Sequence, residues 1–287
     1  MARIAYVNGR YERHGEAMVH IEDRGYQFAD GVYEVCEVAR GNIIDMTRHL
    51  DRLGRSLGEL QIAWPVERAA LSAIMREVAR RNRVHDGMVY IQVTRGVARR
   101  DHVFPKQGTR PSLVVTARSS DPQAARAKAG EGISVITVPE NRWDRVDIKT
   151  VGLLPNVLAR QKAKEVGAAE AWFVDAEGTV KEGAATNAWI VTADGVLVTR
   201  PADFGILRGV TRATVMDVAA RQRLVVEERG FTVEEAQQAR EAFITAATTL
   251  VMPVVRIDDT PVANGHPGTV ALALRESFFE TAEKTPF

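Results

Sequence analysis

Apolar and polar residues follow two different periods along the first half of the chain. Alternation with a period of two predicts strands. It occurs in residues 3–12, 31–46, 88–96 and 111–117. The Asn8-Gly9 pair interrupts the first of these stretches and is typical of a two-residue hairpin turn. In residues 47–62, leucines recur every three or four positions, which predicts a helix, and a second helix is expected from Pro65 to about residue 83.

The second half mixes strands and helices. Strands are predicted at residues 132–138, 169–175 and 187–199, and helices at residues 154–166, 211–221 and 266–282. Residues 118–132 contain few apolar side chains and are interpreted as a linker. The sequence therefore predicts an α+β protein of two unequal domains. The expected boundaries are a small N-terminal domain over 1–118, an interdomain linker over 119–125 and a large C-terminal domain over 126–287.

Composition narrows the possible partners. Of the 287 residues, 45% are apolar, enough for a large core, and the net charge of +1 gives no basic face for nucleic acid. Small molecules are the expected partners. No apolar run is long enough for a membrane span, and the N-terminus "MARIAYVNGRY" lacks the apolar core of a signal peptide, so a cytoplasmic protein is expected. The one cysteine, Cys36, excludes an internal disulfide and is interpreted as a core residue.

The segment "VDIKTVG" places a lysine among apolar residues. If the segment is a strand, alternation puts Lys149 on one face with Asp147 and Val151. Taken alone, this pattern favours a surface lysine beside an aspartate, because a lysine is rarely buried without a function. Other segments change that balance.

Two of those segments offer an acid and an anion site. In "GTVKEGAATNAWIV", Glu182 shares a strand face with Val180, and the strand ends at Gly183, where the backbone can approach a ligand closely. In "GILRGVTRATVMDVAARQ", a glycine precedes a helix start, so the free amides near Val210 and Thr211 can bind an anion. Each segment alone also fits an ordinary structural role, a solvated charge in the first and a helix cap in the second.

Taken together, the chain resembles the fold-type IV enzymes that use pyridoxal phosphate, and within them the D-amino acid aminotransferases. The resemblance runs from "AYVNGRY" to the final helix. Its most specific motifs occur in family order: "EDRGYQFADGVYEV", "HLDRL", "VTRGVARRDHVFP", "DIKTVGLLPNVLARQKAKEVG", "VKEGAATN" and "LRGVTR". It implies pyridoxal 5'-phosphate as cofactor, a smaller α/β N-terminal domain, and a larger C-terminal domain with an antiparallel, barrel-like sheet core.

The resemblance also implies a role for each matching position. Lys149 corresponds to the catalytic lysine that binds the cofactor covalently, which explains a cation pointing inward. Glu182 corresponds to the carboxylate that faces the pyridine nitrogen and keeps it protonated. Arg52, in "HLDRL", corresponds to the arginine that binds the phosphate. The further cofactor contacts that the resemblance implies are Leu207 against the ring and the amides of Val210 and Thr211 on the phosphate.

Substrate recognition separates the subfamilies. Tyr33, together with Arg100 and His102 from the neighbouring subunit, matches the D-aminotransferase site for the α-carboxylate. An arginine can bind a carboxylate through two hydrogen bonds, and a spacing of two can put both loop residues on one side of an extended loop. Val35 is expected in the same substrate pocket. The resemblance therefore implies a homodimer that shares active-site residues across its interface.

Two positions depart from or add to the family pattern. Near "FITAATTLVMPV" the family usually has a hydroxyl residue at the phosphate, whereas this chain has Ala247, with Thr248 next to it as the candidate. Glu37 shares a strand face with Tyr33 and Val35, where it either disfavours acidic substrates or pairs with a loop arginine.

The sequence thus favours transamination of D-amino acids of the D-alanine type with 2-oxo acids such as 2-oxoglutarate or pyruvate. A branched-chain L-amino acid aminotransferase, an (R)-amine transaminase and an aminodeoxychorismate lyase remain alternatives on the same fold. A non-catalytic pyridoxal phosphate carrier is a further alternative, but a carrier would need neither Arg100 nor His102. No metal is expected. The preferred D-amino acids stay open.

Overall fold

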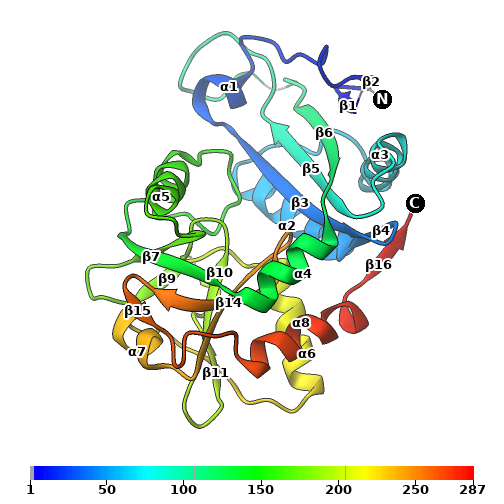
Figure 1. Cartoon of the computed structure of the whole chain (residues 1–287). Helices are drawn as coiled ribbons and strands as arrows, with labels where there is room; N and C mark the ends of the chain where they lie inside the picture. The colour runs from blue at the N-terminus through cyan, green and yellow to red at the C-terminus, as the bar shows by residue number, and fades with distance from the viewer. Residues whose placement is uncertain (1–2, 107, 204) are drawn as a thin grey trace. The chain divides into compact units, whose positions relative to one another are not determined.

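The computed structural model describes residues 3–106, 108–203 and 205–287. The chain divides into two compact units (Figure 1). Unit 1 comprises Met1–Pro122, Ile148–Gly152 and Glu283–Phe287, and unit 2 comprises Gln123–Asp147 and Leu153–Ala282. Two short segments from the later part of the sequence therefore belong to unit 1, and the first of them carries Lys149.

Unit 1 is built on a seven-stranded sheet with the order β16-β4-β3-β5-β6-β1-β2. The strands are β1 (Ile4–Val7), β2 (Arg10–Arg13), β3 (Gly31–Ala39), β4 (Asn42–Ile44), β5 (Gly87–Thr94), β6 (Ser112–Ser119) and β16 (Lys284–Pro286). The predicted hairpin is confirmed, because β1 and β2 pair across Asn8 and Gly9, both of which have positive φ (46° and 100°). β16, at the end of the chain, pairs with β4.

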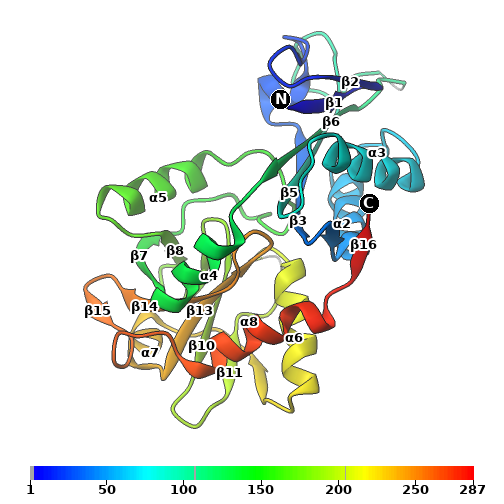
Figure 2. The ribbon, with the colours of Figure 1, turned by 45° about the vertical axis from the view of Figure 1, so that its right-hand side comes forward.

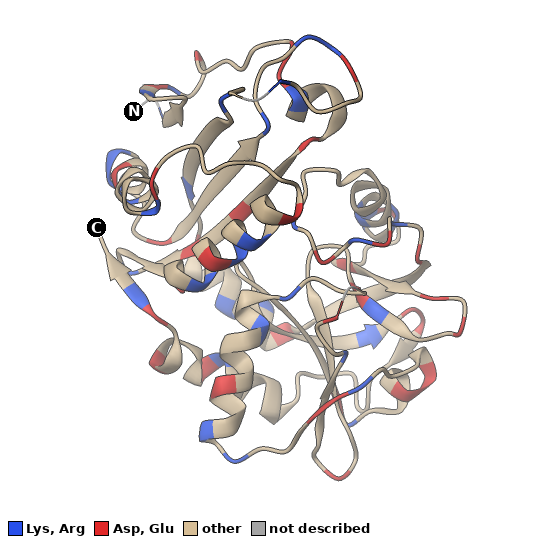
Figure 3. Cartoon of the chain, turned by 180° about the vertical axis from the view of Figure 1, so that it is seen from behind, with Lys and Arg blue, Asp and Glu red and all other residues tan. Residues whose placement is uncertain are grey.

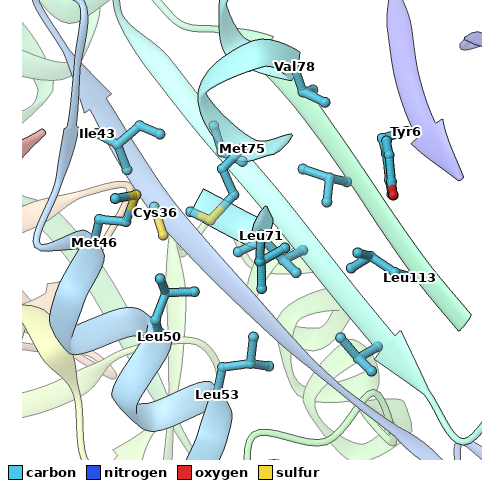
Figure 4. Packing of buried hydrophobic residues seen from close by; sticks show 14 of the residues in the cluster. Tyr6, Cys36, Ile43, Met46, Leu50, Leu53, Leu71, Met75, Val78 and Leu113 are labelled. Carbon is cyan, nitrogen blue, oxygen red and sulfur yellow. The ribbon is translucent and has the colours of Figure 1, made fainter. Parts of the chain in front are cut away.

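Helices cover one face of this sheet. They are α2 (Met46–Glu59) and α3 (Arg68–Arg81), whereas the short helix α1 (Arg24–Phe28) precedes β3. α2 contacts β3, and α3 contacts β1, β5 and β6 (Figure 2). The helix predicted from the regular leucine spacing is confirmed, because Leu50, Leu53 and Leu57 of α2 are all buried in one core. Cys36 of β3 lies in the same core, as Figure 4 shows, and each buried leucine contributes about 2 kcal/mol to it.

The other face of β3 carries the residues that the sequence assigns to the substrate. Burial alternates along β3, so that Tyr33, Val35 and Glu37 are half-buried on one face while their neighbours are buried on the other. In the β3–β5 register these three residues pair with Gln92, Tyr90 and Met88, respectively. The predicted shared face of Tyr33, Val35 and Glu37 is confirmed.

Unit 2 contains a nine-stranded sheet with the order β12-β11-β10-β13-β14-β7-β8-β9, and β15 pairs with β14. The strands are β7 (Ile133–Pro139), β8 (Glu170–Val174), β9 (Val180–Gly183), β10 (Asn187–Val191), β11 (Leu197–Thr199), β12 (Val226–Glu228), β13 (Glu241–Ala246), β14 (Leu250–Ile257) and β15 (Thr260–Pro261). β9 also contacts β10, so this part of the sheet curls into a barrel-like core, as predicted. The sheet is mixed, because β11–β12, β14–β7 and β7–β8 pair in parallel.

The helices of unit 2 include one in the stretch that the sequence analysis interpreted as a linker. They are α4 (Pro122–Glu131, whose first residue is counted with unit 1), α5 (Leu154–Glu165), α6 (Val210–Arg221), α7 (Val233–Gln238) and α8 (Thr269–Thr281). The stretch 118–132, predicted as a linker, consists largely of α4. Its apolar content is low because α4 buries little more than Ala129, and Pro122 suits the first turn of a helix.

The charged residues are distributed over the structure as the near-zero net charge of the sequence suggests. Figure 3 shows basic and acidic residues interspersed along the helices and strands of both units. Among the described residues, no helix combines the length and the apolar character needed to cross a membrane.

Candidate active site

Lys149 lies in an irregular segment, so "VDIKTVG" does not form the strand that the sequence analysis considered. This segment pairs with β3 through one isolated β-bridge, between Thr150 and Val32. The N–H of Tyr33 donates to the carbonyl of Lys149 (3.0 Å), and the N–H of Val151 donates to the carbonyl of Gly31 (3.0 Å). A strand requires a continuous ladder, whereas this segment crosses from unit 2 to unit 1 at residues 147 and 148. Its few bonds nevertheless fix the backbone of Lys149 to the start of β3.

The side chain of Lys149 is half-buried against an aromatic pair. Its Nζ lies 4.1 Å from the centroid of the Tyr33 ring, a cation–π distance. The Tyr33 ring stacks on that of Tyr90, with 5.7 Å between centroids. Tyr90 donates its hydroxyl to Gln92 Oε1 (2.8 Å), and burial, together with nearby Tyr33, raises the pKa of Tyr90 to about 12. Tyr90 is therefore a neutral donor. The structure brings together two of the predicted site residues, Lys149 and Tyr33.

Arg52 is held by a buried carboxylate that sequence reasoning missed. Arg52 Nε and Nη2 donate to the two oxygens of Glu34, at 2.8 Å each, and His49 Nδ1 lies 2.7 Å from Glu34 Oε2. Burial pushes the pKa of Glu34 upward, but the charge and hydrogen bonds of Arg52 and the hydrogen bond of His49 outweigh it and lower the pKa to about 2. Glu34 is thus ionised and orients the guanidinium. The available signal was alternation in β3, which places Glu34 on the core face.

Glu182 of β9 is 4% exposed and accepts hydrogen bonds from several donors. Arg142 Nη1 donates at 2.7 Å, Asn187 Nδ2 at 3.0 Å and the N–H of Leu207 at 3.1 Å. Arg142 also binds Glu140, with 2.6 Å between Nη2 and Oε2. The predicted buried face of β9 is confirmed, and the structure brings Glu182 and Leu207 together. Arg142 and Asn187 were missed, because their contacts with Glu182 depend on the tertiary fold.

The start of α6 has the features of an anion site. Gly209 is the N-cap residue, and no side chain caps the helix there. A Cβ on Gly209 would overlap Asn187 Oδ1, so glycine is required for this close approach. Val210 and Thr211 are buried in the first turn, where backbone N–H groups lack partners within a helix.

The hydroxyl candidate near the end of β13 lies differently from the expectation. Thr248 is exposed in the turn between β13 and β14, and Ala247 beside it is half-buried. The side-chain hydroxyl of Thr249 is buried and, within the described part of the chain, has no hydrogen-bond partner. The turn therefore offers Thr249 as its buried hydroxyl.

Arg100 and His102 are exposed in the loop between β5 and β6. Both contact the ring of Phe28 at the end of α1. Arg100 Cζ lies 4.6 Å from the Phe28 centroid, and the imidazole centroid of His102 lies 5.4 Å from it. The two side chains thus lie beside one ring.

Unit membership of the predicted residues follows from the division of the chain. Unit 1 holds Tyr33, Val35, Arg52, Arg100, His102 and Lys149, and unit 2 holds Glu182, Leu207, Val210, Thr211 and Thr248. The described residues include no group of three or more His, Cys, Asp or Glu side chains that could hold a metal ion.

Comparison with known proteins identifies the family. The family model of amino-transferase class IV matches residues 31–257, which is well over half of the chain. The chain belongs to aminotransferase class IV. Its activity is therefore that of an aminotransferase.

Relatives with known names extend over nearly the whole of this aminotransferase. The D-alanine aminotransferase of Listeria innocua serovar 6a is 38% identical over 275 residues, covering 96% of this chain and 94% of the relative. The D-alanine aminotransferase of Bacillus licheniformis is 38% identical over 282 residues, covering 97% and 98%.

Solved structures share the fold of this aminotransferase. A branched-chain amino acid aminotransferase from T.th., solved with pyridoxamine 5'-phosphate, has a TM-score of 0.88 at 27% identity and covers 98% of this chain and 94% of that one. The branched-chain amino acid aminotransferase of Escherichia coli has a TM-score of 0.89 at 22% identity, with coverage of 98% and 94%. These likenesses support the expected fold-type IV architecture.

Proposed function

We propose that this chain is a pyridoxal 5'-phosphate-dependent aminotransferase that transfers the amino group of D-amino acids, of the D-alanine type, to 2-oxo acids such as 2-oxoglutarate or pyruvate. The observation that carries the proposal is the 38% identity to D-alanine aminotransferases over almost the full length of both chains. A cytoplasmic location and a homodimer belong to the same proposal.

The residues present fit this cofactor. A phosphate needs positive and N–H groups. In unit 1 the oriented guanidinium of Arg52 would suit a phosphate, and in unit 2 the N–H groups at the start of α6 would suit one. A protonated ring nitrogen needs a carboxylate, which Glu182 provides, and an aldehyde needs an amine, which Lys149 provides. When bound, pyridoxal phosphate withdraws electrons from the α-carbon of the amino acid.

Lys149 is the proposed catalytic base. Its Nζ accepts the proton of the substrate α-carbon and later gives that proton up. The backbone bonds to β3 fix the Cα of Lys149, and its Nζ lies 4.1 Å from the centroid of the Tyr33 ring. Proton transfer from one side selects one enantiomer only when the substrate carboxylate is also held in a fixed position.

Glu182 and Arg52 are proposed to orient the cofactor. Three donors fix the Glu182 carboxylate, so it has a defined direction toward a ring nitrogen. Arg52 is fixed through its two bonds to Glu34. Because a guanidinium carries several N–H donors in a rigid fork, Arg52 can bind Glu34 and a phosphate oxygen at the same time.

Tyr33, Arg100 and His102 are proposed to bind the substrate α-carboxylate, with Arg100 and His102 reaching the active site of the partner subunit. Arg100 and His102 are exposed and both contact the Phe28 ring, which supports this role, because a carboxylate can reach two exposed donors that are held near one ring. Val35 and Glu37, on the same strand face as Tyr33, are the proposed neighbours of the substrate side chain.

A branched-chain L-amino acid aminotransferase is the second candidate, favoured by the 27% identity and TM-score of 0.88 to the branched-chain enzyme solved with pyridoxamine 5'-phosphate. Steady-state assays separate the two. We expect D-alanine and 2-oxoglutarate to give pyruvate and D-glutamate, measured by chiral chromatography. Efficient turnover of L-leucine, together with L-glutamate as product, would instead assign the branched-chain activity.

A further inference from the structure

A buried arginine at the start of α1 binds the backbone of the loop that carries Arg100 and His102. Arg24 is 3% exposed. Its Nη1 donates to the carbonyl of Asp101 (2.6 Å) and lies 3.4 Å from the carbonyl of Val103. These two carbonyls flank His102 in the chain. Arg24 therefore fixes the loop backbone at the point where its polar side chains emerge.

Arg24 is itself held in place by a carboxylate shared with a second arginine. Arg24 Nε donates to Asp30 Oδ2 at 2.7 Å. Arg95 Nε donates to the same oxygen at 2.7 Å, and its Nη2 donates to Asp30 Oδ1 at 2.9 Å. Burial pushes the pKa of Asp30 upward, but the hydrogen bonds and charges of the two arginines lower it overall. Asp30 is therefore a carboxylate at neutral pH, and it balances part of their positive charge.

The same network reaches the loop side chains through aromatic rings. Arg24 Cζ lies 4.8 Å from the centroid of Phe28, the ring that Arg100 and His102 also contact. Arg95 Cζ lies 3.7 Å from the centroid of Phe104, two residues after His102 in the loop. The loop is thus held at its backbone by Arg24 and at its side chains by Phe28 and Arg95.

Backbone bonds join α1 to the start of the loop. The N–H of Arg24 donates to the carbonyl of Gly96 (2.9 Å), and the N–H of Ala98 donates to the carbonyl of Glu22 (3.3 Å). Gly25 has no room for a side chain, because a Cβ there would overlap Thr94 Cγ2. This close approach explains why the motif "EDRGYQFADG" needs its first glycine, and it leaves the Arg24 guanidinium facing the loop.

We propose that Arg24 is a positioning residue for recognition of the substrate carboxylate. It acts through the loop, holding Arg100 and His102 beside the Phe28 ring so that the loop is already ordered when a carboxylate binds. This inference rests on the proposed role of Arg100 and His102. A loop that must become ordered when the substrate binds lowers the affinity for that substrate. Loss of the contacts that fix the loop beforehand should therefore raise KM for D-alanine more than it lowers kcat.

The first test compares Arg24→Gln, Arg24→Lys and Phe28→Leu with the wild-type holoenzyme. We expect Arg24→Gln to raise KM for D-alanine about tenfold, equivalent to about 1.4 kcal/mol, while kcat changes by less than about threefold. Arg24→Lys retains a charge for Asp30 but has no fork to span Asp30 and the loop carbonyls, so a smaller rise in KM is expected. Phe28→Leu removes the aromatic ring that Arg100 and His102 share but keeps both arginines that pair with Asp30. This variant should also raise KM for D-alanine.

Arg80→Gln is the matched control, because Arg80 is an exposed arginine paired with Glu77 in α3, and it should leave KM unchanged. Unfolding temperatures of all variants separate a general loss of stability from the change in KM. Unchanged KM in the Arg24 variants that fold would overturn the proposal. If neither Arg24 variant folds, unchanged KM in Phe28→Leu would overturn it.

A second test asks whether Arg24 acts through the loop. In the Arg100→Ala/His102→Ala background, Arg24→Gln should lower kcat/KM for D-alanine by less than about twofold, because residues that act as a unit are not additive. A further tenfold loss in that background would contradict the proposal. Full activity of Arg100→Ala/His102→Ala itself would instead remove the loop from substrate binding, which is the failure of the proposed function.

Discussion

The guanidinium of Arg52 forms two hydrogen bonds with the carboxylate of Glu34, each 2.8 Å long, in a site where Glu34 is fully buried. From its sequence context alone, Arg52 would be expected to lie in solvent on its helix. Its bonds to Glu34, which also contacts His49, hold it instead as a rigid, charged donor. Because the partner is buried and ionised, removing it leaves an uncompensated charge in the core of unit 1.

Glu34→Gln should lower the free energy of unfolding at pH 7 by on the order of 3 kcal/mol, since it breaks a buried ion pair. The folded pKa of Glu34, about 2, lies below its ordinary value of about 4.5. The stabilisation by ionised Glu34 is therefore complete above pH 4.5 and lost as the pH falls toward 2. Urea unfolding of both proteins should show the difference narrowing over that range. A difference independent of pH would mean that Glu34 is not charged in the folded protein.

Lys149→Ala should lower kcat for D-alanine at least about 100-fold, because the proposed general base is lost. The fold should survive, since the hydrogen bonds that fix this segment are made by its backbone. Steady-state kinetics and thermal unfolding measure the two effects. Lys162→Ala, on the exposed side of α5, is the control and should retain full activity. Near wild-type turnover by Lys149→Ala would exclude it as the base.

Glu37→Gln should shift substrate preference toward D-glutamate. Glu37 shares the half-buried face of β3 with Tyr33 and Val35, so a negative charge there opposes an acidic side chain bound beside it. We expect the ratio of kcat/KM for D-glutamate to that for D-alanine to rise about tenfold, or about 1.4 kcal/mol. If the ratio stays constant, Glu37 does not face the substrate side chain.

Gly209→Ala should weaken cofactor binding and destabilise unit 2 by about 1–3 kcal/mol, the usual cost of forcing atoms into a packed site. The new Cβ displaces Asn187, which donates to both Glu182 and the carbonyl of Leu207. Cofactor titration followed by absorbance, with denaturant unfolding, measures both effects. Gly130→Ala in α4 is the matched control, because a Cβ there meets open space. Equal cofactor affinity in the two variants would exclude the α6 start as part of the site.

Local patterns predicted the regular elements well. The leucine spacing of α2 and the alternation of β3 and β9 depend on neighbours a few residues apart, so the sequence carries them directly. α4 was missed because its helical character comes from alanines and not from an apolar stripe. The resemblance to a known family, and not periodicity, pointed to Arg52 and Arg100.

The rest of the site depends on contacts between distant residues. Arg142 reaches Glu182 from 40 positions away, and Arg24 reaches Asp101 from 77 positions away. No local pattern encodes such pairs. The irregular path at Lys149 has the same origin, because its conformation is set by a few bonds to β3 and not by its own alternation.

The most direct test of the proposed function is the absorption spectrum of the purified protein, followed after separate additions of D-alanine and L-alanine without any 2-oxo acid. We predict a yellow protein in which D-alanine, and not L-alanine, converts the aldehyde form of the cofactor to the amine form. Conversion by an L-amino acid such as L-leucine instead of D-alanine, or by neither, would contradict D-amino acid transamination.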